Sequence, residues 1–215
     1  MKISIIIPVH KDEENARKLI LYLQRFCQNS EIIVILSSKT PVFKMNNVII
    51  VPSRYSHRAK QLNEGAKKAS GDILFFCHAD SYPPKTLEKD VTTSESGTFK
   101  LRFDSKHIIT RLVTYRSGVN YSGFIYGDRG LFMTRLLFTT LGGFREDILM
   151  EDNDAIKRVK KISHFTILSS TTKTSARRYK SIGYYRLQFT YFTLYTLNLL
   201  GFSQKKLKKI YYSLC

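Results

Sequence analysis

Uninterrupted runs of β-branched and other apolar residues recur through the first part of the chain, and they constrain the fold more than any other feature. A run without polar alternation is typical of a strand covered on both faces, as in a parallel sheet. Four segments have this pattern: Ile3–Val9, Glu31–Leu36, Val48–Val51 and Asp72–Cys77. We therefore expect them to be strands of one buried sheet, and we interpret the N-terminus as a strand and not as a signal peptide.

The segments between these runs have helical spacing. In Glu13–Cys27 the apolar residues fall at positions 16, 19, 20 and 23, and Ala59–Ala69 is followed by Gly71, a residue that commonly ends helices. Alternating strands and helices predict an α/β fold with a mostly parallel sheet flanked by helices. The 215 residues contain no internal repeat, low-complexity tract or linker, so we expect a single domain.

The second half of the chain is less regular. We expect a Gly- and Tyr-rich loop at Ser117–Gly130 that forms a wall of a binding site. The predicted elements are a strand at Gly97–Phe103 and helices at Ile108–Tyr115, Glu151–Val159, Tyr184–Leu200 and Gln204–Tyr212.

The chain is strongly basic, with 35 Lys and Arg against 17 Asp and Glu and a formal charge of +18. This charge predicts an anionic binding partner. Three classes of partner are anionic: nucleic acid, an acidic membrane surface and a phosphate-bearing small substrate. Three widely spaced cysteines, Cys27, Cys77 and Cys215, do not form a disulfide framework. A reducing compartment, the cytoplasm, fits this pattern best.

Ligands of open α/β sheets bind beyond the carboxyl ends of the strands, so the residues that follow each strand are the first candidates. Residues 10–14 (HKDEE) follow the first strand, and His78 and Asp80 follow the fourth. A carboxylate at this position can bind a divalent cation, which can neutralise a diphosphate leaving group. Alternatively, Asp80 only caps the turn before Pro83 and Pro84.

Two further segments carry polar groups suited to a site. Near the start of the second helix lie Arg54, Arg58, Gln61 and Asn63, donors that favour anions or base edges, although a solvated basic helix is the simpler explanation. Glu151 and Asp152 are expected at a helix N-terminus, where the helix dipole stabilises a carboxylate that must accept a proton from a hydroxyl. Helix capping explains this pair of acids equally well.

The C-terminal helix leaves two alternatives open. Polar residues at 186, 190, 193 and 196 recur at helical spacing and predict a broad apolar face on the other side. The helix is short for a membrane span and carries Arg186, Gln188 and Asn198. Either it packs on the α/β core, or it docks on anionic lipid with the help of Lys205, Lys206, Lys208 and Lys209, which would place the protein peripherally on the inner face of the membrane.

These motifs occur together in a recognisable order. The segments that carry the resemblance are Ile5–Glu14, Arg58–Asp72, Phe75–Ser81, Gly97–Leu101, Tyr126–Phe132, Gly142–Phe144, Met150–Asp152, Thr174–Arg178, and Gly183 with Leu200–Ser203. With them the chain resembles glycosyltransferase family 2, the inverting enzymes of GT-A (Rossmann-like) fold, and most closely the small bacterial branch labelled transferase 2, rSAM/selenodomain-associated. The resemblance implies a donor-nucleotide half (1–103), an acceptor and catalytic half (104–182) and a C-terminal helical extension (183–215).

The resemblance also implies roles for single residues. Asp80 matches the metal-binding aspartate for Mn²⁺ or Mg²⁺, with His78 where many relatives have another aspartate, and Asp152 matches the base that deprotonates the acceptor, with Glu151 as the alternative base. Arg177 and Arg178 match residues that bind the diphosphate or close the site. The remaining expected substrate-binding residues are Pro8, His10, Glu13, Glu14, Ser37, Arg54, Arg58, Gln61, Asn63, Tyr126, Gly127 and Asp128.

One position departs from the family pattern. Relatives usually end the second strand with an aspartate that contacts the donor base, whereas this chain has Ser37 and Ser38 there. Either hydroxyl can hydrogen-bond a base, but without a charge. The nucleotide of the donor is therefore left open.

Three functions remain at this stage. The first is a metal-assisted inverting glycosyltransferase that uses a nucleotide-sugar donor and an acceptor hydroxyl, which is lipid-linked if the C-terminal helix docks on a membrane. The second, a nucleotidyltransferase, lacks its Gly-rich phosphate loop after the first strand. The third, a basic module for nucleic acid or membrane without catalysis, leaves the acids at 80, 151 and 152 unexplained, because carboxylates repel a polyanion. We therefore do not expect nucleic acid as a partner.

Overall fold

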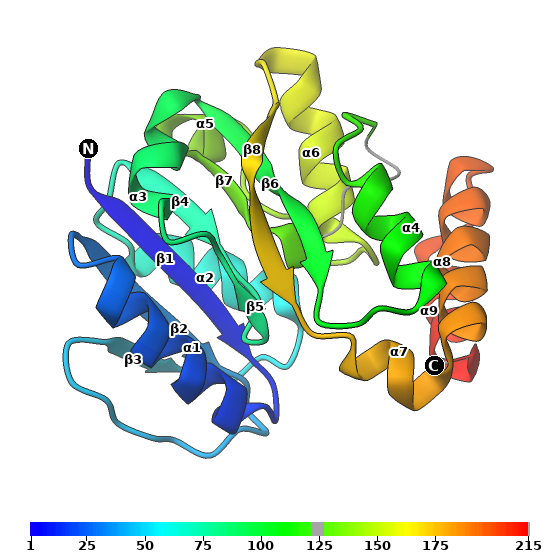
Figure 1. The fold of residues 1–215 in the computed structure, drawn as a ribbon, viewed down its shortest axis with the longest axis horizontal. Helices are drawn as coiled ribbons and strands as arrows, with labels where there is room; N and C mark the ends of the chain where they lie inside the picture. Colours follow the sequence, from blue (N-terminus) through cyan, green and yellow to red (C-terminus); the bar gives the residue numbers. More distant parts are fainter. Residues whose placement is uncertain (122–126, 215) are drawn as a thin grey trace.

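The centre of the molecule is an eight-stranded sheet in the order β3-β2-β1-β4-β7-β6-β8-β5 (Figure 1). The computed structural model describes residues 1–121 and 127–214. The strands are β1 (Ile3–Val9), β2 (Ser30–Leu36), β3 (Ile49–Pro52), β4 (Ile73–Phe76), β5 (Ser81–Tyr82), β6 (Ser96–Phe103), β7 (Leu131–Thr134) and β8 (Thr166–Thr174).

The sheet is mixed, with a parallel half made by the N-terminal strands. β1 pairs in parallel with β2 and β4, and β2 pairs in parallel with β3, as the sequence predicts. β7 lies antiparallel between β4 and β6, which divides the parallel N-terminal strands from the parallel pair β6 and β8. Neither β7 nor β8 was predicted, because β7 is only four residues long and β8 is rich in threonine and serine.

Helices cover both faces of the parallel strands, which explains the uninterrupted apolar runs. Ile5 and Ile7 of β1 belong to a cluster with α1, whereas Ile6 belongs to a cluster with α2 and α6. The helices of four or more residues are α1 (Glu13–Phe26), α2 (Arg58–Lys68), α3 (Leu87–Asp90), α4 (Ile108–Arg116), α5 (Arg135–Thr140), α6 (Glu151–Ile162), α7 (Arg177–Ile182), α8 (Tyr184–Leu199) and α9 (Gln204–Leu214). Side chains on both faces of β1 are therefore buried, and Pro8 is partly buried.

The C-terminal helices form a separate layer at one end of the sheet, beside α4 (Figure 1). A small third core joins Leu101 and Phe103 of β6 to Tyr179 of α7 and Leu187 of α8. The expected polar face of α8 is wrong, because Thr190 is buried while Phe189 and Phe192 are exposed. The Thr190 hydroxyl donates a hydrogen bond to the Arg186 carbonyl of its own helix, which allows its burial.

Within the described residues, we find no helix that is both long enough and apolar enough to span a bilayer.

Candidate active site

The carboxyl ends of β1, β2 and β4 meet at one edge of the sheet, as the parallel pairing requires. At this edge His10 Nδ1 lies 3.0 Å from Ser37 Oγ. The buried Gln61 donates hydrogen bonds to the carbonyls of Val9 and Ile35 and so ties α2 to both strands. These three expected substrate-binding residues therefore lie at the predicted edge, but Ser37 and Gln61 already have internal partners.

Arg58, at the start of α2, is the centre of the site. Its guanidinium donates to Glu151, to Asp152 Oδ2 at 3.1 Å and to His78 Nε2 at 2.7 Å. Because arginine only donates, Nε2 of His78 is the acceptor. The other ring nitrogen, Nδ1, then donates to Asp128 Oδ1 at 2.7 Å. The structure thus joins five residues that the sequence singled out from separate motifs.

The two acids at the start of α6 differ in their electrostatics. Burial raises the pKa of the Asp152 carboxyl above its ordinary value, and the charge of Glu151 adds to this effect. Burial also acts to raise the pKa of Glu151, but the charge of Arg58 together with backbone and Arg58 hydrogen bonds lowers it on balance. Asp152 is therefore the stronger base of the pair, and Glu151 is the firm partner of the guanidinium.

The backbone before the two acids is unusual. Met150 has φ of 62°, a left-handed conformation that non-glycine residues seldom adopt. Strain of this kind persists where the surrounding structure determines the geometry. Gln204 of α9 accepts a hydrogen bond from the backbone of Leu149, one residue earlier. The C-terminal helices thus help to hold the segment from which the two acids project.

A second charged group lies at the ends of β1 and β4, around Arg177 of α7. Its guanidinium donates to both carboxylate oxygens of Asp12, at 3.2 and 2.6 Å, and lies 3.8 Å from Asp80. Burial raises the pKa of Asp80, and the charge of Asp128 raises it further. Asp12 was not among the predicted site residues, although its position directly after the first strand was a usable signal.

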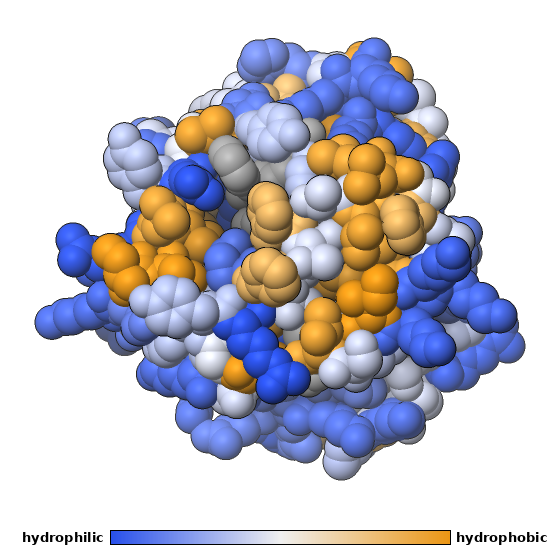
Figure 2. Space-filling view, turned by 90° about the vertical axis from the view of Figure 1, so that its right-hand side faces the viewer, coloured by the Kyte–Doolittle hydropathy of each residue, from blue (hydrophilic) through white to orange (hydrophobic). Residues whose placement is uncertain are grey.

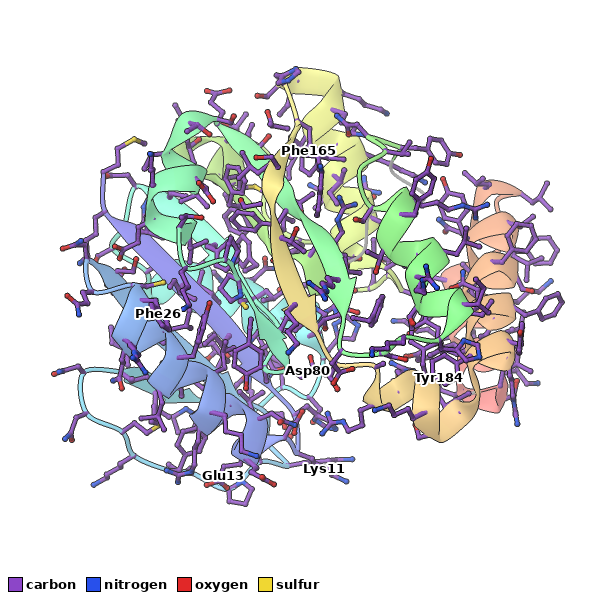
Figure 3. All side chains as sticks on the ribbon, in the orientation of Figure 1. Lys11, Glu13, Phe26, Asp80, Phe165 and Tyr184 are labelled. Carbon is purple, nitrogen blue, oxygen red and sulfur yellow. The ribbon has the colours of Figure 1, made fainter. Side chains whose placement is uncertain are left out.

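The side chains of Asp80 and Arg177 lie between the sheet and the C-terminal helices. Figure 3 shows Asp80 at the lower ends of the strands, above the labelled Lys11 of the β1–α1 connection and to the left of Tyr184 of α8. A cavity of about 520 Å³ borders Asp80 on the side of β5. Of the predicted site residues, only Asp80 lines it; its other lining residues include Tyr22, Tyr82, Lys85 and Lys173.

Several predicted residues are not brought into the Arg58 cluster. Glu13 and Glu14 pair with Arg17 and Lys18 on the surface of α1. Arg54 lies over the ring of Tyr55. Asn63 binds the backbone of Phe144. Arg178 donates to Tyr211 of α9, and its charge, after those of His78 and Arg58, helps to lower the pKa of Asp128 against the effect of burial. Pro8 is partly buried within β1, and Tyr126 lies outside the described residues.

The residues near Asp80 fit a divalent cation that arrives with a phosphate ligand. Among the described residues, no group of three His, Cys, Asp or Glu side chains is placed to hold a metal by itself. Mg²⁺ and related ions are, however, often held by one or two carboxylates while substrate phosphates supply other ligands. The raised pKa of Asp80 beside Asp128 indicates negative charge that the protein neutralises incompletely, which a cation would relieve.

Known proteins resemble this chain in sequence and in fold. Residues 4–98 match the family model of glycosyl transferase family 2. A dolichol-phosphate mannosyltransferase from Pyrococcus furiosus is 29% identical over 115 residues, which cover 46% of this chain and 31% of the relative. The chain thus spans about a third of the length of this curated relative. The predicted resemblance to the family is confirmed, whereas the proposed bacterial branch stays a prediction.

Solved structures confirm the GT-A fold. A mannosyltransferase from Pyrobaculum calidifontis, in complex with GDP-mannose and Mn²⁺, superposes with a TM-score of 0.71 at 13% identity, covering 94% of this chain and 64% of that one. TarS from S. aureus (residues 1–349), in complex with UDP-GlcNAc, has a TM-score of 0.65 at 15% identity and covers 81% and 58%. The family match contains His78 and Asp80 and ends before Glu151 and Asp152.

Proposed function

We propose, from the match of residues 4–98 to glycosyl transferase family 2, that this chain transfers a sugar from a nucleotide-sugar donor to an acceptor hydroxyl, with inversion and with the help of a divalent cation. The observation that carries the proposal is the chain of contacts from Asp128 through His78 and Arg58 to Asp152. It joins Asp152, the proposed base, to the end of β4 that carries Asp80. Both ends of a displacement reaction thus have a charged group in one site.

Asp152 is the residue that we propose as the general base. Its raised pKa makes it a better proton acceptor than an ordinary aspartate, and its carboxylate packs against the backbone of Gly127, which fixes its position in the site. Glu151 holds Arg58, and through it the guanidinium positions both Asp152 and His78. This division of roles favours Asp152 over Glu151 as the base.

Asp80 and Arg177 form the side of the site that we propose for the leaving group. Asp80, with Asp128 nearby, would hold the Mn²⁺ or Mg²⁺ ion, which neutralises a diphosphate when bound. Arg177 now pairs with Asp12, and its exposed guanidinium is close enough to Asp80 to turn towards an incoming diphosphate. A planar guanidinium suits phosphate oxygens and would stabilise the charge that develops on the departing group.

The donor is a nucleotide sugar of UDP or GDP type in this proposal, because UDP-GlcNAc and GDP-mannose are the ligands bound by the two structural neighbours. The second strand contributes only hydroxyls for a donor base. Ser37 is occupied by His10 and Thr40, whereas Ser38 is exposed and bonded to Ser56. We therefore assign the base contact to Ser38 in place of the charged residue usual in the family.

Matched variants at the two acids test the assignment of the base. Asp152→Asn keeps the shape of the side chain and should lower turnover of UDP-GlcNAc or GDP-mannose by about 10²–10⁴-fold while donor affinity is nearly unchanged. Glu151→Gln should have the smaller effect on turnover. If Glu151→Gln abolished turnover and Asp152→Asn did not, the base would be Glu151. If neither nucleotide sugar bound the wild type, with or without Mn²⁺, the proposed function would be wrong.

The metal contribution has its own test. Donor affinity measured calorimetrically across a Mn²⁺ titration should rise with metal in the wild type and should show no metal-dependent rise in Asp80→Ala. Glu14→Ala is a matched control, because Glu14 is an exposed acid paired only with Lys18. An equal metal response in the wild type and Asp80→Ala would remove Asp80 from the metal site.

A further inference from the structure

Two helices at the C-terminal end of the molecule each expose a stripe of large apolar residues. On α4 the stripe consists of Ile108, Leu112 and Tyr115, and on α8 it consists of Tyr185, Phe189 and Phe192. The intervals of three and four residues place each stripe along one side of its helix. Phe189 and Phe192 are 68% and 65% exposed, which is unusual for phenylalanine. We name these six residues the α4–α8 face.

The two stripes lie on neighbouring helices. The ring of His107 at the start of α4 stacks on Tyr184 at the start of α8, with centroids 3.7 Å apart, and Ser105 Oγ lies 3.0 Å from the Tyr184 hydroxyl. Figure 2 looks onto this end of the molecule and shows extended hydrophobic areas with hydrophilic groups among and around them. Contiguous exposed apolar surface rimmed by polar groups marks an interaction site.

Burial of α8 does not explain these phenylalanines. The helix packs inward through Leu187, Thr190 and Leu194, all at most 2% exposed. The polar Thr190 therefore lies inside while Phe189 and Phe192 lie outside. A helix that only packs on the core would bury its phenylalanines and expose its threonine. We therefore infer that the outer face of α8 contacts an apolar partner outside the core of this chain.

Charge identifies the kind of partner. The segments that carry both stripes, 105–121 and 155–215, contain no aspartate or glutamate, and the second of them contains thirteen lysines and arginines. Arg111 and Arg186 are exposed beside the stripes on α4 and α8. A second copy of the chain would bring these like charges together, whereas an anionic bilayer offers both apolar depth and opposite charge.

We propose that the α4–α8 face docks on the surface of an anionic lipid bilayer, with its aromatic side chains at the boundary between headgroups and acyl chains and with Arg111 and Arg186 at the phosphates. Tyrosine and phenylalanine on one side of a helix and arginine beside them are the composition that such interfaces favour. The proposal concerns binding only and does not depend on catalysis.

Docking also has a consequence for the active site, which rests on the proposed function. The neighbouring helix α9, which packs against α8, contacts the segment before the two acids, since Gln204 accepts a hydrogen bond from the backbone N–H of Leu149. A docked protein would therefore hold its site close to the membrane surface, where an acceptor hydroxyl or phosphate anchored in lipid would meet it.

Vesicle co-sedimentation tests the docking face without any donor, so its result is independent of the proposed function. We expect the wild type to bind vesicles of phosphatidylserine and phosphatidylcholine at low salt, to bind pure phosphatidylcholine at least about tenfold more weakly, and to lose affinity as salt is added. Phe189→Ser with Phe192→Ser should weaken binding by about tenfold or more, because the apolar anchor is removed.

Control variants separate docking from loss of the fold. Leu21→Ser removes an exposed leucine of α1, far along the chain from the face, and should bind as the wild type does. Arg111→Glu with Arg186→Glu changes only exposed charges and should weaken binding to the anionic vesicles while thermal unfolding is unchanged. Absence of binding to anionic vesicles at low salt would overturn the proposal. So would self-association in the absence of lipid that the Phe189→Ser, Phe192→Ser variant abolishes, because the face would then be an interface between copies.

Discussion

Gly127→Ala is the substitution that tests the geometry of the proposed active site most directly. A Cβ atom at position 127 would fall well inside van der Waals distance of Asp152 Oδ2, 2.9 Å from His78 Nε2 and 3.3 Å from the Arg58 guanidinium. To restore an ordinary carbon–oxygen separation, the carboxylate would have to retreat by about 1 Å. Its bonds to Arg58 and to the backbone of Asn153 would shift with it.

A displacement of this size in a catalytic group costs about 10²-fold in rate. We therefore expect Gly127→Ala to lower the release of nucleoside diphosphate from UDP-GlcNAc or GDP-mannose by about 10²-fold. The affinity for the donor, measured calorimetrically, should change little, because we propose that the diphosphate binds at the Asp80 side of the site. The thermal unfolding midpoint should stay near that of the wild type, since the crowded atoms are side-chain atoms at the site.

Gly118→Ala is the matched control. The nearest atom to an added Cβ there is the end of the Lys100 side chain at 3.8 Å, so the substitution should be tolerated. Wild-type turnover in a correctly folded Gly127→Ala protein would refute the reasoning, because the carboxylate could then move by about 1 Å without effect. Equal losses in both variants would also refute it, since the effect would then be that of any loop glycine.

Three further predictions concern stability and reactivity. Hydrogen bonds from hydroxyl and backbone N–H groups lower the pKa of Glu31 to about 2 against the opposing effect of burial. Because the pKa is lower in the folded state, the ionised Glu31 stabilises the fold at pH values above the unfolded pKa. Above pH 5 the free energy of unfolding in urea should be about 1–2 kcal/mol higher for the wild type than for Glu31→Gln, a value already reduced for solvent screening. This difference should disappear as the pH falls towards 2. Burial raises the pKa of Cys27 to about 12 and also that of Cys77, so in a Cys215→Ser background a thiol reagent at pH 8 should react only after denaturant is added. Gly65→Ala should gain up to about 1 kcal/mol in helix propensity but lose about 1–3 to a clash with Ile6, so we expect net destabilisation in the same urea assay.

The N-terminal half of the fold was predictable because its pattern is local. A strand covered by helices on both faces must be apolar at every position, and β1 meets this condition through Ile5, Ile6 and Ile7. The antiparallel β7 was not predictable, because four residues that pair with strands 58 and 35 positions earlier carry no local sign of their partners. The threonines of β8 are accommodated because Thr172 and Thr174 bury their hydroxyls in hydrogen bonds.

The sequence predicted many residues of the candidate site, but not which of them contact one another. His78 and Asp80 were identified because the ends of parallel strands define one edge. Within the segment 10–14, Glu13 and Glu14 were predicted to bind substrate and Asp12 was not. Which of these side chains points into the site depends on where the first helix begins and on the position of Arg177, which pairs with Asp12. For α8 the sequence left both a core-packed and an outward apolar face open, and it misplaced Thr190, because the spacing of polar residues does not show which side of a helix meets the core.

By itself the sequence determined the strands and helices of the N-terminal part, the edge of the sheet that carries the site and the basic character of the C-terminal part. Only the tertiary structure decided that Arg58 joins Glu151, 93 positions away, to His78, and that Asp152 becomes the stronger base of the two acids. The physical reason is that strand and helix patterns are properties of neighbouring residues. Electrostatic effects depend on distances and burial in space, and a carboxylate acquires its pKa only when the folded chain has removed its water and placed a charge beside it.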